Sequence, residues 1–226
     1  FKNIENEFPK TLPTFYKYIH NGHFPSLNDE MLPRAYSYKP RKRTGEEPKI
    51  RVNNTIRKGR TLDNLKEYLE IHPEANIVEM DTVIGKFEDK KCIMTLYFRN
   101  SKLMLMFLIN KYKPQEVTKI FKKLYKSLGY DLFTKLFEVV LTDNGWEFSR
   151  PEEIEFDFNT GEKLINVFYC NPYSSWEKGG IERNHEFIRY IIPKGITFDQ
   201  LTDKNIIDMM NNINNVKRKS MEYKTP

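Results

Sequence analysis

The apolar residues of this chain fall in short runs, and this limits what it can fold into. The longest run, residues 103–109, has the length of a β-strand and is far too short to span a membrane. Residues 76–83 and 91–99 form two more strand-like segments before it, and Asn100 and Ser101 between the second and third are a hairpin signal. Three consecutive short strands predict a main domain built around a β-sheet.

Helix-like segments alternate with two further strands after this point. Apolar residues recur at helical spacing over residues 114–128, and Gly129 ends that pattern. The remaining predicted elements are helices at 131–137, 180–192 and 203–215 and strands at 138–142 and 164–169. This order is that of the ribonuclease-H-like fold, although order alone does not identify a fold. We expect an α/β domain with a mixed five-stranded sheet flanked by helices.

The N-terminal part has a different composition. Residues 10–24 contain a short amphipathic stripe, equally typical of the last helix of a helix-turn-helix unit and of an ordinary helix. Residues 34–60 carry ten Lys or Arg against two Asp or Glu, whereas the rest of the chain carries 27 basic and 29 acidic residues. Clustered cations indicate an anionic polymer such as DNA, or else a solvated linker.

These differences predict three regions. They are a partial helix-turn-helix region at 1–33, a basic linker or arm at 34–60 and the main α/β domain at 61–226. Because the chain begins with Phe1 and not Met, we expect it to be part of a longer protein.

Three carboxylates stand where chemistry is expected in such a sheet. Asp81 is late in the first strand, Asp143 directly follows the fourth, and Glu182 is near the start of the helix at 180–192. Each also has an ordinary explanation: a surface strand residue, a turn and a favourable helix dipole, respectively. If the first and fourth strands are parallel neighbours, Asp81 and Asp143 converge. Glu79, on the same strand face as Asp81, is a competing assignment.

The chemistry of these side chains favours hard cations. Three carboxylates suit Mg²⁺ or Mn²⁺, and two such ions can clamp the attacking and leaving oxygens of a phosphodiester displacement. Cys92 and Cys170 are far apart and form no CxxC pair, so neither a zinc site nor a disulfide framework is predicted.

Four ordered motifs carry a resemblance to a known family. They are VEMDTVIG (78–85), LTDNGWEF (141–148), FYCNPYSSW (168–176) and KGGIERNHEFIR (178–189), the last followed by IPKG (192–195). The chain resembles bacterial transposases of the insertion-sequence-thirty family, whose core is a ribonuclease-H-like "DDE" domain of the integrase catalytic type. Asp81 and Asp143 are separated by 61 residues, and Asp143 and Glu182 by 38. The family often has Ser where this chain has Trp146, and its members begin with a fuller helix-turn-helix region.

The resemblance implies a mechanism and a set of partners. It makes Asp81, Asp143 and Glu182 the ligands of two Mg²⁺ (or Mn²⁺) ions in a catalytic domain at 61–226. Water would hydrolyse a phosphodiester at a transposon end, and the freed 3′-OH would then attack target DNA. It also implies self-association on DNA, no membrane, no small-molecule cofactor, and a cytoplasmic location at the bacterial nucleoid. We expect the sheet to preset the two aspartates and Glu182 to be misplaced without metal and DNA.

Other residues are assigned supporting roles, each with a surface or packing role as the alternative. Candidates for DNA contact are Lys39, Arg41, Lys42, Arg43, Lys178, Arg183, Asn184 and Arg189. Candidates for supporting the site or stacking on a base are Glu147, His185, Tyr173 and Trp176. Two other functions stay open: a transposon-derived DNA-binding protein without catalysis, and a nuclease that hydrolyses without joining.

Overall fold

The computed structural model describes residues 12–26, 52–111, 113–171 and 174–226. The chain divides into two compact units, Phe1–Glu47 and Pro48–Pro226. In the first unit, helix α1 (Leu12–His20) is followed by a turn at Gly22, whose φ of 74° suits glycine. The predicted division at residues 33 and 60 stays a prediction. No helix among the described residues combines the length and apolarity needed to cross a membrane.

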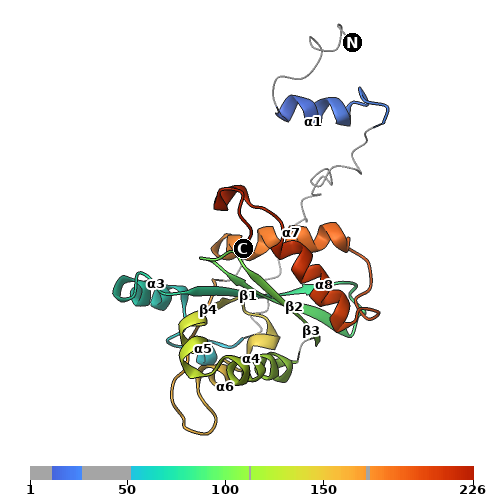
Figure 1. The fold of residues 1–226 in the computed structure, drawn as a ribbon. Helices are drawn as coiled ribbons and strands as arrows, with labels where there is room; N and C mark the ends of the chain where they lie inside the picture. Colours follow the sequence, from blue (N-terminus) through green and yellow to red (C-terminus); the bar gives the residue numbers. More distant parts are fainter. Residues whose placement is uncertain (1–11, 27–51, 112, 172–173) are drawn as a thin grey trace. The chain divides into compact units, whose positions relative to one another are not determined.

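The second unit is built on a five-stranded sheet with the order β3-β2-β1-β4-β5 (Figure 1). Its strands are β1 (Ile77–Ile84), β2 (Lys91–Phe98), β3 (Met104–Asn110), β4 (Val139–Thr142) and β5 (Asn166–Tyr169). The strand β1 runs antiparallel to β2 and parallel to β4; β3 is antiparallel to β2, and β5 is parallel to β4. The predicted mixed five-stranded sheet is confirmed, with its first and fourth strands as parallel neighbours.

Helices cover both faces of this sheet (Figure 1). The longer ones are α3 (Leu62–Ile71), α4 (Pro114–Leu128), α5 (Tyr130–Leu136), α7 (Gly179–Ile191) and α8 (Asp203–Asn214). The sequence did not predict α2 (Asn54–Arg57) and α6 (Glu152–Glu155), because four residues are too few to show helical periodicity. The 3₁₀ turns η2 (Trp146–Phe148), η3 (Ser175–Lys178) and η4 (Lys219–Met221) were missed for the same reason.

Alternation along β1 divides the apolar side chains between two cores. Val78 and Met80 pack with residues of α4 and α5 on one face, whereas Val83 packs with Ile181 and Ile188 of α7 on the other. Glu79 and Asp81 share the strand face of Val83, since alternate residues of a strand point the same way. The polar face of β1 is therefore the one that α7 covers.

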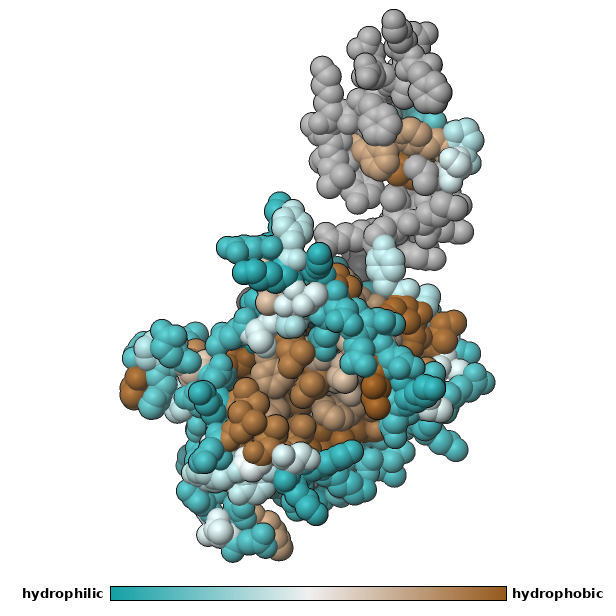
Figure 2. All heavy atoms as spheres, in the orientation of Figure 1, coloured by the Kyte–Doolittle hydropathy of each residue, from teal (hydrophilic) through white to brown (hydrophobic). Residues whose placement is uncertain are grey.

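The strand β3 is an edge strand, and α8 protects part of that edge. The Asn214 side chain donates to the Met104 carbonyl at 2.8 Å and accepts from the Met104 amide at 3.0 Å. Phe107 and Leu108 further along β3 are only partly buried. Figure 2 shows hydrophobic side chains gathered on the viewed face, between the layer of α7 and α8 and the layer of α4 and α5.

The described end of the basic segment, residues 52–60, is packed within the second unit. Val52 is fully buried in the core between the sheet and α4. Arg60 donates to Glu155 through Nε at 3.0 Å and Nη2 at 2.6 Å, and its carbonyl accepts from the Tyr169 amide at 2.8 Å. Residues 52–60 are thus fixed to the sheet by burial and by hydrogen bonds.

Candidate active site

The carboxyl ends of β1 and β4 bring two of the predicted acids together. Met80 on β1 is opposite Thr142 on β4, so Asp81 and Asp143 each follow a member of the same parallel pair. Parallel neighbouring strands project the residues at their carboxyl ends toward a common edge, where sites of open sheets gather. The Asp81 carboxylate is mostly buried, whereas that of Asp143 is half exposed.

A buried ammonium group lies between these two acids. Lys178 Nζ is 3.1 Å from Asp81 Oδ2 and 4.0 Å from Asp143 Oδ2, and it donates to the Met80 carbonyl at 3.4 Å. Burial alone would lower the pKa of Lys178, but the two carboxylates together raise it above its ordinary value. The sequence predicted Lys178 as a DNA contact, and here it is the cation that Asp81 and Asp143 share.

A third acid, Glu147, is bonded to the residue that follows Asp81. Glu147 is buried, and its Oε1 accepts from the Thr82 hydroxyl at 2.7 Å, next to Asp81. A Cβ at Gly145 would be 2.9 Å from Glu147 Oε2 and 3.1 Å from Asp143 Oδ1. Glycine at 145 therefore leaves room for both carboxylates, and the Gly145 amide donates to Asp143 Oδ1 at 3.0 Å.

His185 on α7 contacts Thr95 of β2, the residue that pairs with Asp81 across the two strands. Its Nε2 is 2.9 Å from Thr95 Oγ1, and Thr95 in turn donates to the Asp81 carbonyl at 3.2 Å. Burial lowers the pKa of His185 to about 4, so the imidazole is neutral at neutral pH. His185 is thus linked to the Asp81 backbone through the Thr95 hydroxyl.

Glu182 is exposed on the first turns of α7. Among the described residues, no group of three His, Cys, Asp or Glu is arranged to hold a metal ion, so Glu182 does not join Asp81 and Asp143 in this arrangement. Helix α7 is nevertheless attached to β1. The amide of Ile181, the residue before Glu182, donates to a carboxylate of that strand at 2.6 Å.

That carboxylate belongs to Glu79, the residue that competes with Asp81 as a candidate ligand. Glu79 is 1% exposed and both its oxygens are engaged: Oε1 accepts from Arg99 Nε at 2.6 Å and Oε2 from the Ile181 amide. Sequence reasoning missed Arg99 as part of this arrangement. Two features of the sequence could have indicated the contact between β1 and α7. They are Glu79, two residues before Asp81 on the strand, and the pair Gly179 and Gly180 at the start of the helix.

The other predicted contact residues are divided between surface and interior. Arg183 is exposed, whereas Asn184 is buried, donating to the Gly180 carbonyl at 2.9 Å and accepting from Arg218 at 2.6 Å. Arg189 donates to the Ile84 carbonyl at 2.7 Å and lies over the Phe198 ring. Lys39, Arg41, Lys42, Arg43, Tyr173 and the side chain of Trp176 lie outside the described residues.

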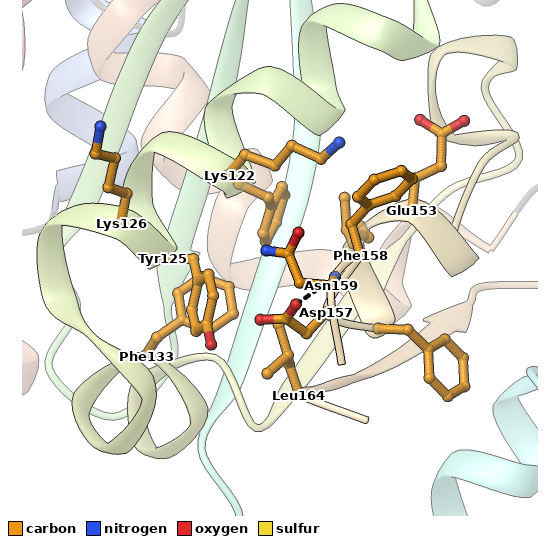
Figure 3. A pocket seen from close by; sticks show the side chains of 12 residues that line it. Lys122, Tyr125, Lys126, Phe133, Glu153, Asp157, Phe158, Asn159 and Leu164 are labelled. Carbon is orange, nitrogen blue, oxygen red and sulfur yellow. Dashed lines mark hydrogen bonds between the residues drawn. The ribbon is translucent and has the colours of Figure 1, made fainter. Parts of the chain in front are cut away.

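Two buried thiols and a cavity are further features of the second unit, and Cys170 is close enough to Lys178 and Asp143 for their charges to act on its thiol. Burial raises the pKa of Cys92 and of Cys170 to about 12, so both thiols are protonated. A cavity of about 390 Å³ opens among α4, α5, α6 and the loop after α6, where Lys122 lies 5.3 Å from the Phe158 ring centroid (Figure 3). It lies against the α4 face of the sheet, opposite to α7.

The donor set around Lys178 is suited to a divalent cation. Asp81 and Asp143 present hard oxygen donors from adjacent strand ends, and they already share one buried positive charge. Hard cations such as Mg²⁺ prefer such carboxylates. These two residues fit the implied metal, and Glu182 completes the set only if its side chain turns toward them.

Comparison with known proteins gives insertion-sequence transposases among the relatives of this chain. The chain is 34% identical over 166 residues to the transposase for insertion sequence element IS4351 of Bacteroides fragilis, covering 73% of this chain and 47% of that protein. It is 28% identical over 134 residues to the transposase InsI for insertion sequence element IS30C of Escherichia coli, covering 59% and 33%. The chain thus spans half or less of these relatives, and the resemblance to insertion-sequence transposases is confirmed.

No protein-family model matches the chain. Among solved structures it is similar to the catalytic core domain of BIV integrase, with a TM-score of 0.44 and 21% identity over 66% of this chain and 90% of that one.

Proposed function

We propose that this chain, a relative of insertion-sequence transposases, catalyses metal-dependent cleavage of transposon ends and their transfer to target DNA. The observation that supports this most is the meeting of Asp81 and Asp143 around a shared cation at the ends of two parallel strands. In the proposed reaction, water hydrolyses one phosphodiester and releases a 3′-OH, which then displaces a second 3′-oxygen in target DNA. Two in-line displacements require no covalent link between protein and DNA.

In this proposal each residue of the site has a role that follows from its position. Asp81 and Asp143 would hold two Mg²⁺ or Mn²⁺ ions, with Glu182 as the third ligand. When bound, such ions lower the pKa of water and stabilise charge on the attacking and leaving oxygens. Lys178 balances the charge of the two aspartates and would pair with a phosphate once these hold the metal ions. Arg183, which is exposed beside Glu182, would contact the DNA backbone.

The partners follow from the same reaction. Two ends must be joined, so we infer that copies of the protein assemble on DNA, and that it works at the nucleoid of a bacterial cell. Membranes and small-molecule cofactors have no part in this scheme.

The proposal is tested with the whole chain, Mg²⁺ and labelled duplexes taken from the two flanks of its own gene. Replacing Asp143 by Asn should lower the rate of nicking by roughly 10³-fold or more, because it removes several kcal/mol of charge stabilisation. Asp131→Asn, exposed on α5, is the matched control and should cleave at the normal rate. Undiminished nicking by the Asp143→Asn protein would rule out the carboxylate site.

Product analysis separates the alternatives. A transposase yields strand-transfer product, a hydrolytic nuclease yields nicks alone, and a DNA-binding protein without catalysis yields neither while still shifting the duplex. We expect joined product from the unmodified chain and normal DNA binding by Asp143→Asn.

The basic segment is assigned to phosphate contacts. We expect neutral residues at Lys39, Arg41, Lys42 and Arg43 to weaken the salt dependence of DNA binding. The slope of log K, the logarithm of the DNA association constant, against log salt should become smaller in magnitude by roughly 3 to 4, since each phosphate contact contributes about 0.9. This quadruple substitution leaves the packed residues Val52 and Arg60 intact, so the fold of the second unit is unaffected. An unchanged salt slope, measured by fluorescence anisotropy, would show that this segment does not touch DNA.

A further inference from the structure

Glu79 is a buried carboxylate that the metal chemistry does not use. It lies two residues before Asp81 on the same face of β1, and both of its oxygens already accept strong hydrogen bonds. One comes from the guanidinium of Arg99 and the other from the Ile181 amide near the start of α7. A carboxylate at a helix N-terminus is stabilised by the helix dipole as well as by the amide.

Arg99 extends the contact to the turn before the helix. Its Nε bonds Glu79, and its Nη2 donates to the Glu177 carbonyl at 2.6 Å. Residues 177–181 are therefore held at both ends, with Lys178 between the two attachment points. The segment so fixed ends directly before Glu182.

Gly180 allows the helix to come this close. A Cβ at position 180 would overlap the Tyr97 ring and lie 3.1 Å from Glu79 Oε2. At the neighbouring Gly179, a Cβ would have no other atom within 4 Å. The close approach is thus specific to the turn that faces Glu79 and β2.

We propose that Glu79 and Arg99 form a positioning clamp that sets the first turn of α7, and with it Glu182, relative to Asp81. The inference rests on the proposed function for its catalytic consequence, but the clamp itself is defined by contacts within the chain. Glu79 acts through α7 and is not a metal ligand, because both its oxygens are committed to Arg99 and Ile181. Glu182 follows the anchored Ile181 directly, so the clamp fixes the backbone from which its side chain extends.

The chain contains a matched control for this clamp. Glu155 is also buried, accepts from Arg60 and accepts from a backbone amide, that of Val167 at 2.9 Å. It joins α6 to β5, on the α4 face of the sheet and away from α7. Glu155→Ala therefore removes the same kind of buried interaction without affecting the turn that carries Glu182.

The test compares Glu79→Ala, Glu79→Gln and Glu155→Ala by three measurements. These are thermal unfolding, hydrogen exchange of the Ile181 amide by NMR, and the Mg²⁺ dependence of cleavage. We expect Glu79→Ala to speed Ile181 exchange at least 10-fold, raise the half-saturating Mg²⁺ concentration about 10-fold and lower kcat about 100-fold. Glu79→Gln, whose amide oxygen still accepts from Ile181, should recover most of the exchange protection and part of kcat.

The opposite outcomes are distinct. Slow Ile181 exchange in Glu79→Ala, or a Mg²⁺ dependence that Glu155→Ala shifts equally, would overturn the clamp. If the unmodified chain cleaves no DNA with Mg²⁺ or Mn²⁺, the proposed function fails. The exchange of Ile181 and the calorimetric affinity for Mg²⁺ alone then still decide whether Glu79 positions the turn. If the Glu79→Ala protein does not fold, the same measurements on Glu79→Gln and Glu155→Gln provide the comparison.

Discussion

Two buried glutamates of this chain accept the same kinds of hydrogen bond, one from an arginine and one from a backbone amide, but they hold different parts of the fold. Glu79 joins a strand to the helix that carries Glu182, through Arg99 and the Ile181 amide. Glu155 joins α6 to β5, through Arg60 and the Val167 amide. The first is next to Asp81, and the second fixes the end of the basic segment to the fold.

The difference lies in what each clamp holds in place. A buried charge pair contributes little net stability compared with apolar packing, but it fixes one geometry because each partner is costly to leave unpaired. At Glu155 that geometry serves the attachment of residues 52–60. At Glu79 it determines the position of the exposed Glu182 relative to Asp81 and Asp143. The same kind of interaction thus stabilises the scaffold at Glu155 and positions a candidate metal ligand at Glu79.

The largest expected effect comes from removing the arginines. Arg99→Met and Arg60→Met should each lower the free energy of unfolding by about 3 kcal/mol, because each leaves a buried carboxylate with a backbone amide alone. Urea denaturation of the two proteins measures this. In cleavage assays only Arg99→Met should also need more Mg²⁺. If Arg60→Met shifted the Mg²⁺ requirement as strongly, the two clamps would not differ in function.

The sequence allowed the sheet and both aspartates to be predicted, and the reason is local. Strand periodicity, the hairpin at Asn100 and the turn after residues 138–142 all act over a few residues, so the ends of β1 and β4 could be located. Arg99 and Lys178 could not be assigned, because their roles depend on contacts 20 and about 100 residues away in the chain. Lys178 looked like a surface cation, and only the packing of η3 against β1 places it inside.

Asn184 illustrates the same limit on the helix itself. From its place in the motif we predicted it as a candidate for DNA contact. In the fold its amide bonds the Gly180 carbonyl and Arg218, so it ties α7 to the C-terminal segment. Helical periodicity was the available signal, because Asn184 lies three residues after Ile181 and four before Ile188, on the face that these two isoleucines bury.

The middle expected effect is at the contact between α7 and the sheet. Gly180→Ala should lower the free energy of unfolding by about 2 kcal/mol, because its methyl group overlaps the Tyr97 ring and forces α7 outward. The same displacement moves the Ile181 amide from Glu79, so Ile181 exchange should accelerate as in Glu79→Ala. Normal exchange at Ile181 in a destabilised Gly180→Ala protein would mean that the strain is relieved at Tyr97 and not at the clamp.

The smallest effect is expected one residue earlier, and it shows whether the clamp depends on contact or on chain flexibility. Gly179 has helical backbone angles, and nothing lies within 4 Å of an added Cβ. Alanine there should stabilise the fold by about 0.5 kcal/mol, because it restricts the unfolded chain and favours the helix. Cleavage and Mg²⁺ dependence should be unchanged. If Gly179→Ala instead lowered kcat, flexibility of the turn before Glu182, and not its attachment to Glu79, would be what catalysis requires.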